Sequence, residues 1–286
     1  MEQRNREQWY SKLFRIFNSG VCFSLAYIIF THLSWFMMGL VGKFWKFDSF
    51  VYYFGIKFIL NNHTWTKLKV LFVYSTAPIF FLIAGLLCVY FFDKLKNIKT
   101  LLNVFFLWGF VIGTCVFCAQ GVISALGAGE YNSPYYQNFA VVFAWLHIPV
   151  VLVYALIIPF FILLVYFSVN YARLFLIFAY SYTKVNKLSR RRKYFLETAI
   201  APYFMGALIT SVLTFPMNIF IHGIYLMVIG FALLISWVAL FYIEIMKDDV
   251  VKYKTLQTAN IVFLAFLIAI MTIVVITWKG LYLSVS

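Results

Sequence analysis

Apolar stretches long enough to cross a lipid bilayer fill most of this 286-residue chain, and almost no acidic residue interrupts them. Hydrophobic residues make up 64% of the sequence and charged residues only 11%. A soluble domain cannot bury so much apolar surface. A bilayer core favours apolar side chains and makes each backbone segment satisfy its own hydrogen bonds as a helix. The sequence therefore predicts an all-α, polytopic transmembrane helical bundle, with residues 1–286 forming a single integral membrane domain.

Seven stretches each meet the length of roughly 20 residues that a spanning helix requires. They lie near residues 18–42, 69–92, 101–126, 139–169, 198–221, 223–246 and 256–278. The fifth and sixth stretches are separated only at 221–223, which predicts a tight antiparallel hairpin of helices. The apolar segment at 50–60 is too short to span a bilayer, so we expect an interfacial or re-entrant helix there.

The charges of the loops predict the orientation, because cytoplasmic loops of membrane proteins are rich in Lys and Arg. Basic residues are frequent near the N-terminus and in segments 93–100, 184–193 and 247–254, whereas 127–138 and 221–223 contain none. We therefore expect a bacterial cytoplasmic (inner) membrane protein with a cytoplasmic N-terminus and a C-terminus on the other side. One loop disagrees, since residues 43–69 should lie outside but contain several lysines.

The formal net charge of +14 would suggest nucleic-acid binding in a soluble protein. Here the basic residues lie between apolar spans, so we expect anionic lipid headgroups as partners and no nucleic acid. The densest cluster consists of Lys184, Lys187, Arg190, Arg191, Arg192 and Lys193. Two interpretations stay open: the cluster only fixes the orientation, or it also docks an acidic lipid headgroup or an acidic protein partner.

Residues that could carry chemistry are scarce. No Asp or Glu lies in the middle of a predicted span, which argues against a proton or cation pump. His32 and His147 lie in two predicted spans and are weak candidate haem ligands, because an interhelical hydrogen bond or a position near the headgroups is the favoured explanation for each. His222, at a span end, is expected to be solvated. Cys115 and Cys118 supply only half of a zinc site, so we predict no metal. The sequence contains no Walker loop, GxGxxG, GxSxG or HExxH motif, so we predict no cofactor and no catalytic residue.

Small residues recur at intervals of four or eight along the third predicted span. They are Gly109, Gly113, Gly121 and Ala125. Such a ridge lets a second helix approach closely. That second helix belongs either to the same bundle or to another membrane protein.

Two segments, THLSWFMMGLVG (31–42) and TAPIFFLIA (76–84), resemble the HExxH and AGPxxN-type regions of site-2-type intramembrane metalloproteases. In this resemblance Thr31 and Trp35 replace the two ligand histidines, and His32 replaces the general-base glutamate. The later aspartate ligand of the family has no counterpart, because the third span contains no acid. The resemblance implies a catalytically inactive relative that binds membrane partners.

These observations favour a non-enzymatic membrane protein. It would be a subunit or accessory of a larger membrane complex, or a protease-like binder of other membrane proteins. The alternative is a transporter or channel for a hydrophobic or anionic solute, because prolines in or near several spans predict kinked helices and the chain is basic. A membrane enzyme that acts on lipids is a third possibility.

Overall fold

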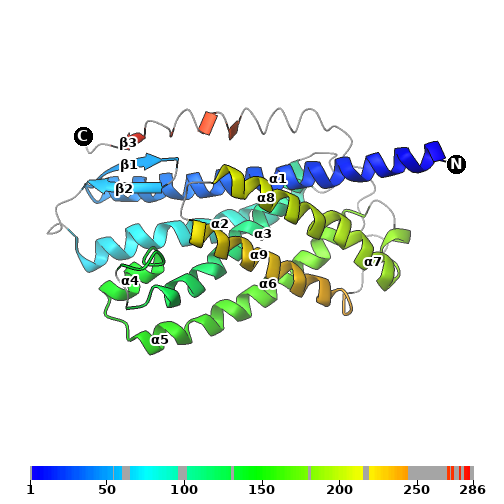
Figure 1. The fold of residues 1–286 in the computed structure, drawn as a ribbon. Helices are drawn as coiled ribbons and strands as arrows, with labels where there is room; N and C mark the ends of the chain where they lie inside the picture. Colours follow the sequence, from blue (N-terminus) through cyan, green and yellow to red (C-terminus); the bar gives the residue numbers. More distant parts are fainter. Residues whose placement is uncertain are drawn as a thin grey trace.

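The structure, a computed structural model, describes residues 2–53, 55–59, 65–95, 102–129, 132–179, 182–214, 219–243, 269–270, 272–273, 277 and 280–283. In chain order its helices are α1 (Glu2–Phe44), α2 (Lys67–Leu95), α3 (Leu102–Leu126), α4 (Phe139–Trp145), α5 (Val150–Ala155), α6 (Ile157–Ile177), α7 (Leu188–Phe195), α8 (Ala201–Leu213) and α9 (Ile219–Ala239). Most of the described residues are helical, which confirms the predicted helical bundle (Figure 1).

Six segments of the described part are long and apolar enough to cross a membrane. They cover Lys12–Phe44, Lys67–Leu95, Leu102–Leu126, Val150–Ile177, Leu188–Leu213 and Ile219–Ala239. Their length and composition support a multi-pass membrane protein. The seventh expected span, 256–278, lies largely outside the described residues, so the total of seven stays a prediction.

The helix α3 lies at the centre of the bundle. It packs against α1, α2, α6 and α9, and 78% of the residues in its apolar central stretch are buried. Trp108 illustrates this position, because its ring is fully buried between Phe23 and Phe175 and its indole nitrogen donates to Ser19 Oγ. A helix apolar on all sides is expected to be surrounded by other helices.

The segment predicted as an interfacial or re-entrant helix at 50–60 is a β-hairpin instead, so this prediction is wrong. The strand β1 (Asp48–Tyr52) pairs antiparallel with β2 (Gly55–Ile59), and Phe50 faces Lys57 in the register. The segment is rich in aromatic and β-branched residues, which favour strands. A third strand, β3 (Leu281–Leu283), pairs with the other edge of β1 and gives the sheet order β2-β1-β3.

Two predicted span boundaries also need correction. The fourth span is divided into α4, α5 and α6, because Pro149 lacks a backbone donor and His147 adopts a positive φ of 56°. The residues 221–223, predicted as a turn, lie inside α9, which begins at Ile219, whereas α8 ends at Leu213. The polar His222 suggested a loop, but its ring is buried and hydrogen-bonded within the bundle.

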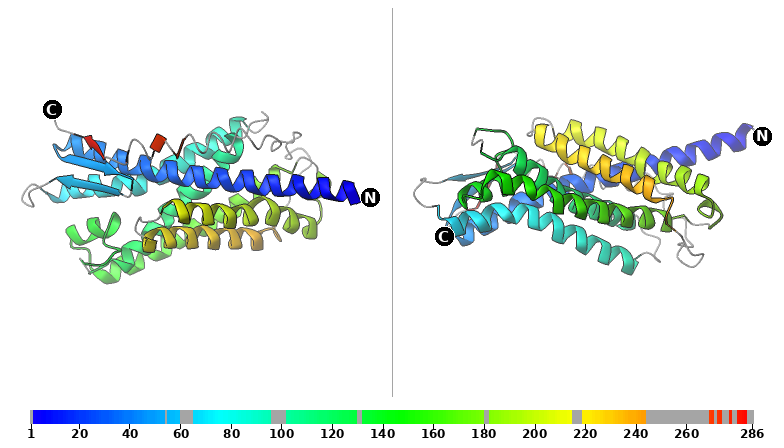
Figure 2. Two further views of the ribbon diagram at one scale, coloured as in Figure 1. Left: turned by 45° about the horizontal axis from the view of Figure 1, so that its top comes forward. Right: turned by 90° about the horizontal axis from the view of Figure 1, so that it is seen from below.

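The bundle has two distinct ends, which we call the hairpin end and the α7 end. The β-strands lie opposite the N-terminus in Figure 1 and in both views of Figure 2. Lys12 pairs with Glu197, directly after α7, at 3.2 Å, and Arg191 of α7 donates to the Ile243 carbonyl beyond α9. Ile243 and Leu281 therefore lie at opposite ends of the bundle.

Candidate functional site

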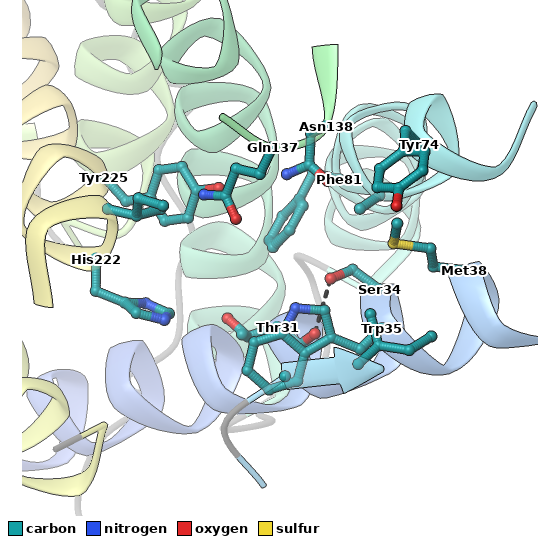
Figure 3. A pocket seen from close by; sticks show the side chains of 14 residues that line it. Thr31, Ser34, Trp35, Met38, Tyr74, Phe81, Gln137, Asn138, His222 and Tyr225 are labelled. Atoms are coloured by element: carbon teal, nitrogen blue, oxygen red, sulfur yellow. Dashed lines mark hydrogen bonds between the residues drawn. The ribbon is translucent and has the colours of Figure 1, made fainter. Parts of the chain in front are cut away.

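A cavity of about 280 Å³ lies at the hairpin end of the bundle (Figure 3). It is formed where α1, α2, α9, β2 and the segment 137–138 meet. Its lining residues are Thr31, Ser34, Trp35, Met38, Gly55, Ile56, Tyr74, Ala77, Phe81, Gln137, Asn138, Ile221, His222 and Tyr225. None of these side chains is acidic, and none is a Lys or Arg. The cavity thus combines apolar walls with neutral hydrogen-bonding groups.

The hydroxyl groups on the α1 wall are already fixed by their own helix. Thr31 Oγ1 donates to the Tyr27 carbonyl at 2.8 Å, and Ser34 Oγ donates to the Thr31 carbonyl at 2.7 Å (Figure 3). Each hydroxyl oxygen keeps lone pairs for a bound donor. The α1 wall therefore offers acceptors rather than an activated nucleophile.

The opposite wall rests on a buried polar network. Gln120 of α3 donates its amide hydrogen to the Tyr225 hydroxyl and accepts a hydrogen bond from Asn138 Nδ2 at 3.3 Å. Asn138 has a φ of 49°, a left-handed conformation that Asn tolerates better than most residues. Sequence reasoning missed Gln120, although a glutamine within an apolar span is itself a signal of a buried polar contact.

His222 extends from α9 towards the middle of the cavity (Figure 3). Its Nδ1 lies 2.7 Å from the Tyr27 hydroxyl, and its ring stacks edge-on against Tyr225 with 5.9 Å between centroids. The expectation that His222 is solvated is wrong, because only 7% of the residue is exposed. The Tyr27 hydroxyl supplies the hydrogen bond that a buried imidazole needs.

The two segments for which we predicted a resemblance to metalloproteases, 31–42 and 76–84, both contribute to the cavity, and the resemblance itself stays a prediction. Thr31, Ser34 and Trp35 come from the first segment, and Ala77 and Phe81 come from the second. This proximity depends on the packing of α1 against α2.

His32 and His147, the haem candidates, are placed differently. The His32 ring nitrogens lie 2.8 Å from the Ile28 carbonyl and 3.0 Å from the Tyr53 carbonyl. His147 is exposed in the turn after α4. Both His32 nitrogens thus face backbone oxygens, and neither histidine lines the cavity. Within the described residues, no three His, Cys, Asp or Glu side chains gather into a possible metal site.

Tyr53 joins the β-hairpin to α8. Its hydroxyl donates to the Leu213 carbonyl at 2.7 Å, and its backbone nitrogen donates to the Thr277 carbonyl at 3.2 Å. Burial raises the pKa of the Tyr53 phenol, so the group stays protonated and keeps donating. The hairpin is thereby held over the cavity.

The small-residue ridge of α3 lies inside the bundle. Gly109 is next to Cys88 of α2, Gly113 is next to Gly85 of α2, and Gly121 is next to the Phe160 ring of α6. Ala125 is 2% exposed. In the structure the ridge is covered by helices of the same chain.

The basic segment 184–193 lies at the α7 end, far from the cavity. Lys184 ends a short 3₁₀ turn, Lys187 precedes α7, and the four remaining basic residues belong to α7.

Comparison of the chain with protein-family models, curated protein sequences and solved structures finds no match.

Proposed function

We propose that this protein is a non-enzymatic membrane protein whose hairpin-end cavity binds an uncharged segment of a membrane partner. The observation that carries the proposal is the lining, which mixes aromatic and aliphatic side chains with neutral amide, hydroxyl and imidazole groups and contains no charged side chain. Such a surface is complementary to a partner segment in which an apolar side chain contacts the apolar walls and a backbone or side-chain amide hydrogen-bonds the neutral polar groups. Charged ligands would lose their hydration there without gaining a counter-charge.

The arrangement of the polar groups argues for binding rather than hydrolysis. Nucleophilic catalysis requires a hydroxyl within hydrogen-bond reach of a base. Thr31 and Ser34 donate to backbone carbonyls, and His222 bonds Tyr27 instead of either hydroxyl. Thr31 and Trp35 stand where the resembling proteases have zinc ligands, and neither hydroxyl nor indole replaces an imidazole at zinc.

The size of the cavity supports part of a larger partner as the occupant. Cavities for whole small-molecule ligands have volumes of about 300–1,000 Å³. The present cavity, about 280 Å³, lies just below that range. One or two side chains of a membrane protein would fill it.

We place the protein in a bacterial cytoplasmic membrane with the α7 end inside, on the basis of the basic residues there.

A cavity-filling variant tests this proposal. We expect Ser34→Phe to exclude the partner, because the added ring projects from the α1 wall into the cavity. The control is Ile162→Phe on α6, a residue that is 61% exposed. Proteins that co-purify in mild detergent with the native chain should be lost from Ser34→Phe and kept by Ile162→Phe. Equal recovery with both folded variants would contradict cavity binding.

A transporter is the second candidate, and the buried chain from Asn138 through Gln120 to Tyr225 favours it. These groups extend the polar lining from the cavity into the centre of the bundle. The absence of Lys and Arg from the lining favours a neutral or hydrophobic solute over an anion. Solute flux in reconstituted vesicles that Ser34→Phe abolishes would replace the binding proposal with this one.

A further inference from the structure

Five of the six basic residues of segment 184–193, those from Lys187 to Lys193, fall into two groups with different surroundings. The first group points inward. Arg191 donates from Nε to the Val185 carbonyl at 2.7 Å and from Nη1 to the Ile243 carbonyl. The Arg192 guanidinium lies over the rings of Phe241 and Trp237, at 3.9 Å and 4.7 Å from their centroids. These two arginines therefore hold the end of α9 against α7.

The second group, Lys187, Arg190 and Lys193, is exposed. Arg190 and Lys193 are three residues apart and so lie about 60° apart around α7, and Lys187 is the N-cap residue directly before the helix. Arg190 Nη1 donates to the Thr183 carbonyl at 2.8 Å, which holds this side chain beside the preceding turn. Phe195, on the opposite side of α7 from Arg190 and Lys193, is buried in the core. The helix α7 thus exposes basic side chains on its outer side, while its inner side is held against the bundle.

The basic face ends where apolar surface begins. The helix α7 continues through a π-helical turn (Leu196–Ile200) into α8, and Leu188–Leu213 together form a candidate span. Leu196, the first residue after α7, is 49% exposed. Glu197, the next residue, is paired with Lys12 and not with the basic face. Basic side chains directly beside an apolar span lie at the depth of lipid headgroups.

We propose that Lys187, Arg190 and Lys193 form a binding face for the phosphate groups of anionic lipids. Arg191 and Arg192 take no part, because their guanidinium groups are committed to α9. This site is separate from the hairpin-end cavity and does not depend on the proposed function. The structure thus assigns different roles to basic residues that appear equivalent in the sequence.

The test is the lipid composition that the purified protein retains. The protein is reconstituted into vesicles of equal phosphatidylglycerol and phosphatidylcholine, extracted in mild detergent and analysed by lipid mass spectrometry. The triple variant K187Q/R190Q/K193Q should lower the phosphatidylglycerol enrichment at least tenfold. Each basic residue near an anionic surface contributes about fivefold in affinity at low salt, so three contribute about a hundredfold, and salt screening reduces this effect.

Two controls separate the site from net charge and from stability. The variant K43Q/K46Q/K57Q removes the same charge from exposed residues of the hairpin end and should lower the enrichment much less. Arg192→Gln should keep the enrichment and lower the melting temperature. Equal losses in the two triple variants, or a loss in Arg192→Gln as large as in K187Q/R190Q/K193Q, would overturn the proposed site.

Discussion

Gly113 of α3 lies directly against Gly85 of α2. A Cβ atom added to Gly113 would be 2.6 Å from the Gly85 Cα and 2.5 Å from the Phe81 carbonyl oxygen. Both neighbours are backbone atoms, so they cannot rotate away as a side chain would. This contact sets the closest approach of α2 to α3, and α2 in turn supplies Tyr74, Ala77 and Phe81 to the cavity.

We therefore expect Gly113→Ala to destabilise the protein by about 1–3 kcal/mol, the usual cost of overpacking a core. Gly223→Ala is the matched control, because a Cβ at Gly223 would meet no atom within 4 Å in the described structure. That variant should be neutral or slightly stabilising, since Ala favours a helix over Gly by about 1 kcal/mol. Thermal unfolding in detergent checks both, and equal melting temperatures would contradict the contact.

The strand β3 stabilises the β-hairpin that lines one side of the cavity. The Tyr282 ring stacks on Phe50 with 4.7 Å between centroids, and β3 pairs with β1. Tyr282→Ala should therefore speed hydrogen exchange of the backbone amides in β1, because a cross-strand aromatic pair contributes up to about 1 kcal/mol. Tyr242→Ala, at a residue 86% exposed near the other end, should leave that exchange unchanged.

The buried network should respond more strongly to loss of its central residue than to loss of one end. Gln120→Leu removes the hydrogen bonds that Gln120 makes to the Tyr225 hydroxyl and to Asn138 Nδ2, whereas Tyr225→Phe removes only one bond. We expect Gln120→Leu to cost about 1–3 kcal/mol, the penalty for unpaired buried polar groups, and Tyr225→Phe to cost less. Chemical unfolding measures the difference. A larger loss of unfolding free energy in Tyr225→Phe than in Gln120→Leu would show that Gln120 is not the central residue of the network.

Cysteine labelling of intact cells checks the proposed orientation. Asn132→Cys lies in the exposed loop between α3 and α4, and Arg190→Cys lies on the exposed face of α7. An impermeant thiol reagent should label position 132 and not position 190. The background should be low, because Cys22, Cys88, Cys115 and Cys118 are all buried. The reverse pattern would place the α7 end outside.

The sequence predicted the helices well and the contacts between them poorly. Length and hydropathy were sufficient to find the six long apolar helical segments of the described residues, because a bilayer leaves a continuous apolar segment few alternatives to a helix. The β-hairpin was missed because Phe50, Val51 and Tyr52 suit a strand as well as an interfacial helix. The partner that favours the strand, β3, comes more than 200 residues later in the chain, and local patterns carry no information about such pairing.

The candidate site shows the same limit. The segments 31–42 and 76–84 were singled out by their resemblance, and they line the cavity together, but His32 of the first segment faces Ile28 and Tyr53 instead. His222 and Gln120 could not be assigned to one site, because the distance between side chains on different helices depends on packing. The six basic residues of 184–193 looked equivalent for the same reason.

The central claim is that the hairpin-end cavity holds part of a membrane partner. Photo-crosslinking in intact membranes tests it most directly, with an azido-phenylalanine, which is close to tyrosine in size, at Tyr74 in the cavity or at Phe161 on the exposed surface of α6. Position 74 should give a discrete adduct with another membrane protein, and Ser34→Phe should abolish that adduct. Position 161 should give lipid adducts only. If position 74 also yields only lipid adducts, or if its protein adduct persists in Ser34→Phe, the account is contradicted.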